Sequence, residues 1–168
     1  MERLCQGNPP AEMRTAEFLV ESSHVTDEIL LPEHDEKIAG ILLHIVPLPG
    51  HTPGMIGIKT LDGAFYVGDS ILAQSLLKKY GVPYFTDIAA TYESLDRLKR
   101  EAESALSFIL AHGGKLASTK IAPLVDEHID RLGRIEQFIV SEDYASKSPV
   151  SCVYTRIMDY YRLNNMQN

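Results

Sequence analysis

Two histidines and one aspartate occupy positions where a polar side chain could do chemistry. His51 lies in the segment LPGHTPG, Asp69 in YVGDSI and His112 in AHGG. Each follows an apolar run that is typical of a strand, and the adjoining glycine allows the backbone to turn sharply. If the three strands are neighbours, two imidazoles and one carboxylate meet at one edge of a sheet. These groups are suitable ligands for zinc, and also for iron or manganese.

A metal ion held at such an edge would lower the pKa of a bound water towards about 7 and so generate a nucleophile for hydrolysis. Each residue also has a structural alternative. A histidine after a Pro-Gly turn commonly shapes a loop, and an aspartate after glycine commonly makes a turn or caps a helix. The metal-binding hypothesis therefore depends on the coincidence of all three residues at strand ends.

The apolar pattern predicts the elements that must position these residues. Strands are predicted at residues 41–48, 55–59, 64–67 and 107–111, with a favoured Asp-Gly turn between the second and third. Helical spacing of apolar residues predicts helices at 88–105, 123–141 and 149–162. The order of the elements predicts an α/β layered fold, in which a mixed sheet carries helices on one face.

Two stretches between these elements are expected to be irregular. The segment 33–40 is polar and turn-rich, and Lys78 and Lys79 are predicted to lie in a solvated loop.

The segment 80–86 contains Tyr84 and Phe85. We expect it to border the candidate site and to favour a partly apolar substrate.

Composition limits the class of protein. The chain has 168 residues, of which 45% are hydrophobic and 23% charged, which indicates one globular domain over residues 1–168. The net charge of −7 argues against nucleic acid or an anionic membrane surface as a partner. No apolar run approaches the about 18 residues of a membrane span, and the N-terminus lacks the order of a signal peptide. Cys5 and Cys152 have no metal or redox spacing, so we expect a reducing, cytoplasmic location.

The three segments quoted above resemble, in order and spacing, the later metal-binding motifs of the metallo-β-lactamase superfamily. The resemblance covers residues 25–140. It implies that His51 binds a first metal, Asp69 bridges two metals and His112 binds the second. With an aspartate rather than a cysteine at position 69, the chain resembles the glyoxalase-II-like and general hydrolase branches more than the classical zinc β-lactamases. The resemblance thus implies a metal-dependent hydrolase with one or two zinc ions, in which activated water attacks an ester, thioester or amide of a small-molecule substrate.

One part of the family pattern is absent. The first family motif, His-x-His-x-Asp-His, supplies four ligands, and this chain contains no His-x-His. The family fold is a four-layer αββα sandwich of two similar halves, so the resemblance implies that residues 1–168 form the C-terminal part of such a domain, with 1–24 as a connecting segment. We expect the parent protein to be a hydrolase, and this chain alone to bind zinc weakly and to be inactive.

The alternative function is association. A lone half of the sandwich would expose the apolar inner face of its sheet, and a large exposed apolar face is unusual for a soluble monomer. The chain would then be a catalytically incomplete fragment whose role is dimerisation. The expected partner is a second copy, giving a homodimer, or the missing N-terminal half.

Other polar residues have weaker claims. Gly68-Asp69-Ser70 resembles the nucleophile block of GDSL-type esterases, with Ser70 as nucleophile, but the block is not near the N-terminus and no late Asp-x-x-His follows it. His44 lies in an apolar run and is predicted to be a packed or edge side chain. His128 lies between acidic residues on a predicted helix and is predicted to be exposed.

Overall fold

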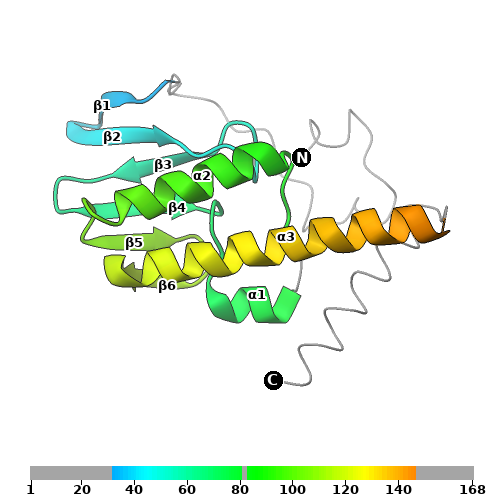
Figure 1. Cartoon of the computed structure of the whole chain (residues 1–168). Coiled ribbons are helices and arrows are strands. Elements are labelled where there is room, and N and C mark those ends of the chain that lie inside the picture. Colours follow the sequence, from blue (N-terminus) through cyan, green and yellow to red (C-terminus); the bar gives the residue numbers. More distant parts are fainter. Residues whose placement is uncertain (1–31, 81–82, 147–168) are drawn as a thin grey trace, which may run out of the picture. The chain divides into compact units, whose positions relative to one another are not determined.

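The structure is a computed structural model that describes residues 32–80 and 83–146. Its six strands form one mixed sheet in the order β1-β2-β3-β4-β5-β6 (Figure 1). The strands are β1 (His34–Ile38), β2 (Ile41–Pro47), β3 (Ile56–Lys59), β4 (Ala64–Gly68), β5 (Ser107–Leu110) and β6 (Gly114–Ala117). The helices are α1 (Gln74–Tyr80), α2 (Ile88–Glu101) and α3 (Ile121–Ser146), with a short 3-10 turn at Ser118–Lys120. The predicted helix 149–162, the predicted connecting segment 1–24, Cys5 and Cys152 lie outside the described residues.

Strand direction determines where the candidate site can form. Strands β4 and β5 pair in parallel, whereas all the other neighbouring strands of the described sheet pair in antiparallel fashion. As a result, β2, β4 and β5 all run in the same direction. Their carboxyl ends lie along one edge of the sheet, which we call the carboxyl edge.

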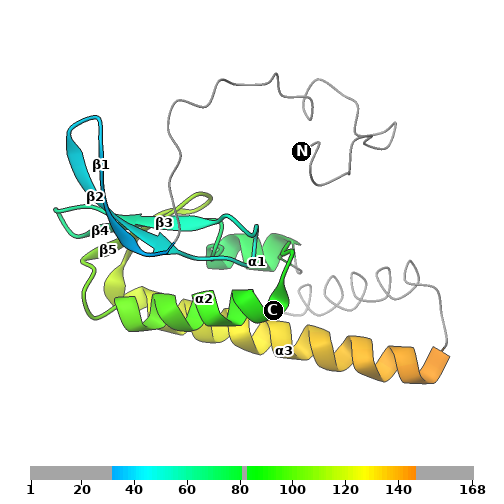
Figure 2. The same ribbon diagram turned by 90° about the horizontal axis from the view of Figure 1, so that it is seen from above.

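Helices α2 and α3 cover one face of the sheet, as predicted (Figures 1 and 2). The rings of Phe65 on β4 and Phe108 on β5 are both fully buried, and their centroids are 5.5 Å apart. They belong to one apolar cluster with Leu95 and Leu98 of α2 and Val125 of α3. Burying side chains of this kind contributes about 1.5–3 kcal/mol each. The core therefore lies between the sheet and these two helices.

The two stretches predicted to be irregular are ordered, and both predictions were wrong. Residues 34–38 form β1, which pairs along its whole length with β2, from His34 opposite Ile45 to Ile38 opposite Ile41. Lys78 and Lys79 lie in the last turn of α1, where positive charge is favourable. Strand β6, after His112, was not predicted either.

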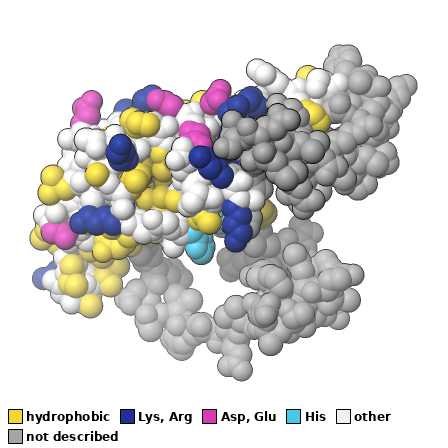
Figure 3. Space-filling view, turned by 90° about the horizontal axis from the view of Figure 1, so that it is seen from below, with side chains coloured by type: hydrophobic (Ala, Val, Ile, Leu, Met, Phe, Trp, Pro, Cys, Tyr) yellow, Lys and Arg dark blue, Asp and Glu magenta, His cyan; other side chains and the backbone are white. Residues whose placement is uncertain are grey.

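The β6 side of the molecule carries several basic side chains. Figure 3 shows this side, and its Lys and Arg side chains are separated by apolar and neutral groups rather than gathered into one continuous surface. Within the described ranges, no helix is both long enough and apolar enough to cross a membrane.

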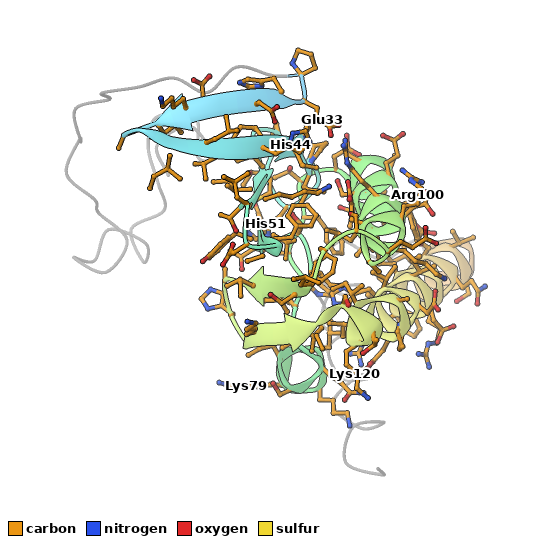
Figure 4. All side chains as sticks on the ribbon, turned by 90° about the vertical axis from the view of Figure 1, so that its left-hand side faces the viewer. Glu33, His44, His51, Lys79, Arg100 and Lys120 are labelled. Carbon is orange, nitrogen blue, oxygen red and sulfur yellow. The ribbon has the colours of Figure 1, made fainter. Side chains whose placement is uncertain are left out.

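A charged network fastens the β1–β2 hairpin to α2. His44 places Nδ1 2.7 Å from Asp35 Oδ1 and Nε2 2.7 Å from Glu33 Oε1. Glu33 also accepts a hydrogen bond from Arg97 of α2. The bond with Asp35, followed by that with Glu33, raises the pKa of His44 above its ordinary value. Glu33 and His44 lie side by side in Figure 4, apart from His51.

This network predicts a pH-dependent loss of stability on replacing His44 with glutamine. Because the pKa of His44 is raised in the folded state, its protonated form stabilises the fold. This stabilisation is complete at pH values below the unfolded-state pKa of about 6.5, and it disappears as pH rises through the folded-state pKa. We expect His44→Gln to lower the free energy of unfolding by up to about 1 kcal/mol at pH 6 and by less at pH 9, because the pair is partly exposed. Urea unfolding at both pH values measures this.

The matched variant is Asp35→Asn, which removes the largest cause of the raised pKa and should reduce the same pH dependence. An equal loss at pH 6 and pH 9 for His44→Gln would contradict the interpretation.

Candidate metal centre

The three predicted residues meet at the carboxyl edge. His51 Nε2 lies 3.9 Å from Asp69 Oδ2, and His112 Nε2 lies 3.8 Å from Asp69 Oδ1. Asp69 thus stands between the two imidazoles, and each of its oxygens faces one of them. The cause is the common direction of β2, β4 and β5, whose carboxyl ends carry the three segments.

The backbone fixes the tautomer of His51. Its Nδ1 lies 2.9 Å from the carbonyl oxygen of Tyr84, which can only accept, so Nδ1 carries the proton and donates. The lone pair of Nε2 is then available on the side that faces Asp69. A histidine that ligates a metal commonly has its other ring nitrogen fixed in this way.

Helix α2 and the two residues before it hold the loop that carries His51. Ser94 Oγ donates to Pro49 O over 2.6 Å, and the backbone N–H groups of Thr86 and Asp87 both donate to Gly50 O. Gly50 has φ of 137°, and a Cβ at this position would lie 2.5 Å from Thr91 Oγ1. Only glycine therefore fits at position 50, where the backbone of the His51 loop packs against α2.

The carboxylate of Asp69 has an unusual environment. Its side chain is 26% exposed, yet Oδ1 is buried and has no hydrogen-bond donor among the described residues. Leaving such an oxygen unpaired costs about 1–3 kcal/mol or more. A carboxylate oxygen that is desolvated, unpaired and aimed at an imidazole is suited to accept a cation.

The spacing of the ligand atoms fits this interpretation. Separations of 3.8 and 3.9 Å are too long for hydrogen bonds. They are shorter than about 4.2 Å, which is the distance between two ligand atoms on opposite sides of one zinc ion. The chemistry of the donor set, imidazole nitrogen and carboxylate oxygen, is that of zinc, iron or manganese.

His112 comes from the loop between β5 and β6. Its side chain is 69% exposed, so it is reached directly from solvent. The following residue, Gly113, has φ of 135°, and a Cβ there would lie 2.4 Å from the Cβ of Ala73. The His112 loop therefore packs against the segment that follows Asp69.

The described ligands do not complete a centre. Among residues 32–80 and 83–146, no group of three or more histidine, cysteine or acidic side chains surrounds a single point. Instead, each oxygen of Asp69 faces one imidazole, so each imidazole and the carboxylate oxygen beside it offer two protein groups. A catalytic zinc usually has three protein ligands.

The structure also places the remaining candidates. Tyr84 borders the candidate site, as predicted: the residue is 56% exposed, and its ring makes an edge contact with the His51 imidazole at 5.4 Å between centroids. Ser70 is buried, and its hydroxyl points to Leu48 O at 3.5 Å rather than to a base.

The prediction that His128 is exposed was wrong, because it is only 4% exposed. It could have been found from spacing, since it lies three residues after Val125 and four before Leu132 on the buried stripe of α3.

Comparison with solved structures identifies the fold. The chain is similar to a metallo-beta-lactamase family protein from Thermus thermophilus, with a TM-score of 0.52 and 22% identity over 68% of this chain and 38% of that protein. It is also similar to a beta-lactamase domain protein from Burkholderia ambifaria, with a TM-score of 0.52 and 16% identity over 89% of this chain and 49% of that protein. No protein-family model and no curated sequence matches. The chain therefore has part of a metallo-β-lactamase fold, and it spans less than half the length of either protein.

Proposed function

We propose that the chain carries part of the metal centre of a metal-dependent hydrolase. The observation that carries the proposal is the buried, unpaired Oδ1 of Asp69, held between the imidazoles of two separate loops. The fold supports it, because proteins of this fold are described as metallo-beta-lactamase family members.

Each residue has a distinct role in this proposal. His51 and His112 would each hold one ion, and the Asp69 carboxylate would be shared between the two. The ions, zinc in the first instance, would supply Lewis acidity and an activated water. The carbonyl of Tyr84 keeps His51 in the ligating tautomer, and the exposed Tyr84 ring offers an apolar wall to a substrate. We propose an ester, thioester or amide substrate, with the aspartate at position 69 favouring a glyoxalase-II-like hydrolase.

The described ligands also limit the activity of the chain by itself. A complete centre requires further ligands, from a segment outside the described residues or from a partner. We expect the purified chain to bind zinc weakly and to hydrolyse esters, thioesters and lactams poorly. Calorimetry with zinc and an assay panel of these substrates measure both properties.

The variants His51→Gln and His112→Gln test the assignment. Each should weaken zinc binding further, whereas His34→Gln should not, because the His34 ring is already bonded to Pro32 O and Glu36. Zinc binding that is insensitive to both site variants would contradict the proposed centre. Tight stoichiometric binding with turnover that requires Asp69 would show that the chain is self-sufficient.

A second candidate function, association, is favoured by the face of the sheet that α2 and α3 leave uncovered. Side chains alternate along a strand, so Tyr66 points away from the helices that pack on Phe65 and Val67. Tyr66 is 48% exposed and lies opposite Ile58 on β3 and Ile109 on β5. This cross-strand row forms an apolar stripe. We propose that it pairs with a second copy, because a two-fold contact is the commonest solution for one apolar face.

This candidate predicts that Tyr66→Lys changes the oligomeric state. We expect the wild-type chain to sediment as a dimer at tens of micromolar and Tyr66→Lys to sediment as a monomer, because a desolvated lysine on the stripe is costly. Leu61→Lys is the control, since Leu61 is highly exposed in the β3–β4 turn and lies off the stripe. A monomeric wild-type chain would rule out the homodimer.

A further inference from the structure

His128 is a buried polar residue that the proposed chemistry does not use. It lies on α3, remote in sequence from the site, and its Nε2 is 3.2 Å from the backbone nitrogen of Leu72 and 3.0 Å from the carbonyl oxygen of the same residue. Burial lowers the pKa of His128, so the ring is neutral at ordinary pH. In either neutral tautomer Nε2 bonds to Leu72, as acceptor from its N–H or as donor to its carbonyl.

Leu72 belongs to the segment that joins Asp69 to α1. This segment leaves β4 after Gly68, carries Asp69, and reaches Ala73 just before α1 begins at Gln74. Ala73 is the residue that would collide with a Cβ on Gly113, the neighbour of His112. The position of residues 69–73 therefore determines how far the Asp69 carboxylate stands from the His112 imidazole.

A second buried polar residue of α3 provides an internal comparison. Arg131 lies one turn after His128, and its Nη1 donates to Leu77 O over 2.9 Å. Arg131 thus holds the middle of α1, whereas His128 holds the residue between Asp69 and Ala73. Both side chains are buried on the same helix, and they contact different parts of the same segment.

We propose that His128 is a positioning residue for the candidate metal centre, which sets the placement of Asp69 relative to His112 through its hydrogen bond with Leu72. The inference rests on the proposed function in one respect, that the site binds metal. The placement of residues 69–73 can be tested without metal.

The first experiment compares zinc affinity in three variants of the full chain. His128→Leu should weaken zinc binding about tenfold, which is the low end of the effect of a group that orients metal ligands. His128→Gln retains a hydrogen-bonding group for Leu72 and should recover most of the affinity. Arg131→Met should lower the unfolding temperature and leave the affinity unchanged. An affinity loss that is the same for His128→Leu and Arg131→Met would overturn the proposal, as would no loss in His128→Leu.

The second experiment uses metal-free protein. It therefore tests the positioning role of His128 even if the proposed metal binding fails. If the wild-type chain takes up no zinc, the metal-binding proposal fails, and backbone NMR still tests the placement. His128→Leu should shift the amide signals of Asp69, His112 and Gly113 and speed amide exchange over 69–73, with partial recovery in His128→Gln. Arg131→Met should change the signals of α1 and of its own surroundings on α3, and leave those of Asp69, His112 and Gly113 unchanged. Unchanged signals of Asp69 and His112 in His128→Leu would overturn the positioning role.

Discussion

Replacing Asp69 with alanine is expected to weaken zinc binding by about a hundredfold or more, while the metal-free chain stays at least as stable as the wild type. In the proposed centre Asp69 is the ligand shared by both metal positions, and loss of a residue that merely supports a ligand already costs about 10–100-fold in affinity. Stability should not fall, because Oδ1 is buried without a donor among the described residues, at a cost of about 1–3 kcal/mol. Calorimetry with zinc and thermal unfolding in the presence of a chelator measure the two effects.

The control for this variant is Asp130→Ala. Asp130 is an exposed residue of α3 that pairs with Arg134 one turn away, with 2.6 Å between the charged atoms. It should change neither zinc affinity nor stability appreciably. If Asp69→Ala unfolded the metal-free chain, Asp69 would have a structural role; if it left zinc affinity unchanged, the proposed centre would be wrong.

Replacing Gly50 with alanine is expected to lower the free energy of unfolding by about 3 kcal/mol or more. Two costs add. The backbone at φ of 137° is strained for any residue with a side chain, and the new methyl group would lie 2.8 Å from the Cα of Thr91, a backbone atom that cannot rotate away. Relief requires the loop to separate from α2, which would displace His51 as well. Urea unfolding measures the stability, and zinc calorimetry on the folded protein reports the displacement.

Two other glycines separate these costs. Gly40 has φ of 84° but open space around a Cβ, so Gly40→Ala should show the strain alone, at about 1–2 kcal/mol. Gly54 has open space and no positive φ, so Gly54→Ala should change stability by less than about 0.5 kcal/mol. If Gly50→Ala cost no more than Gly40→Ala, the packing of the His51 loop on α2 would be looser than described.

The sequence predicts the parts of the fold that carry a strong apolar signal. The apolar runs of β2, β4 and β5 and the periodic stripe of α2 were located to within a few residues, because each buries one face against the core. Strand β1 was missed because it is an edge strand, held by backbone pairing and by the charged network of His44 rather than by apolar burial. Helix α1 was missed because seven residues give too short a period to recognise.

The candidate site, like the fold, could be predicted from the sequence only in part. The identities of His51, Asp69 and His112 could be predicted, since strand ends beside glycine are visible in the sequence. Their convergence on one edge of the sheet was also predicted and is confirmed. The distances between their ligand atoms could not be predicted, because they depend on the order of the strands and on how β4 and β5 pair. The Tyr84 carbonyl that fixes the tautomer of His51 is a backbone group, so no side-chain pattern indicates it.

The pairing of the strands also has a consequence for the order in which the site forms during folding. Strands β2, β3 and β4 are consecutive antiparallel neighbours, joined by the His51 loop of residues 48–55 and by the turn of residues 60–63, so His51 and Asp69 are brought together by contacts close in sequence. His112 joins them only after the chain has passed through α1 and α2 and returned to place β5 parallel to β4. Closing a long crossover costs more chain entropy than closing a hairpin, and contacts distant in sequence form more slowly. A refolding chain should therefore hold the His51–Asp69 half of the centre before it acquires His112, an order that pulse-labelled hydrogen exchange would reveal as protection of β2–β4 ahead of β5.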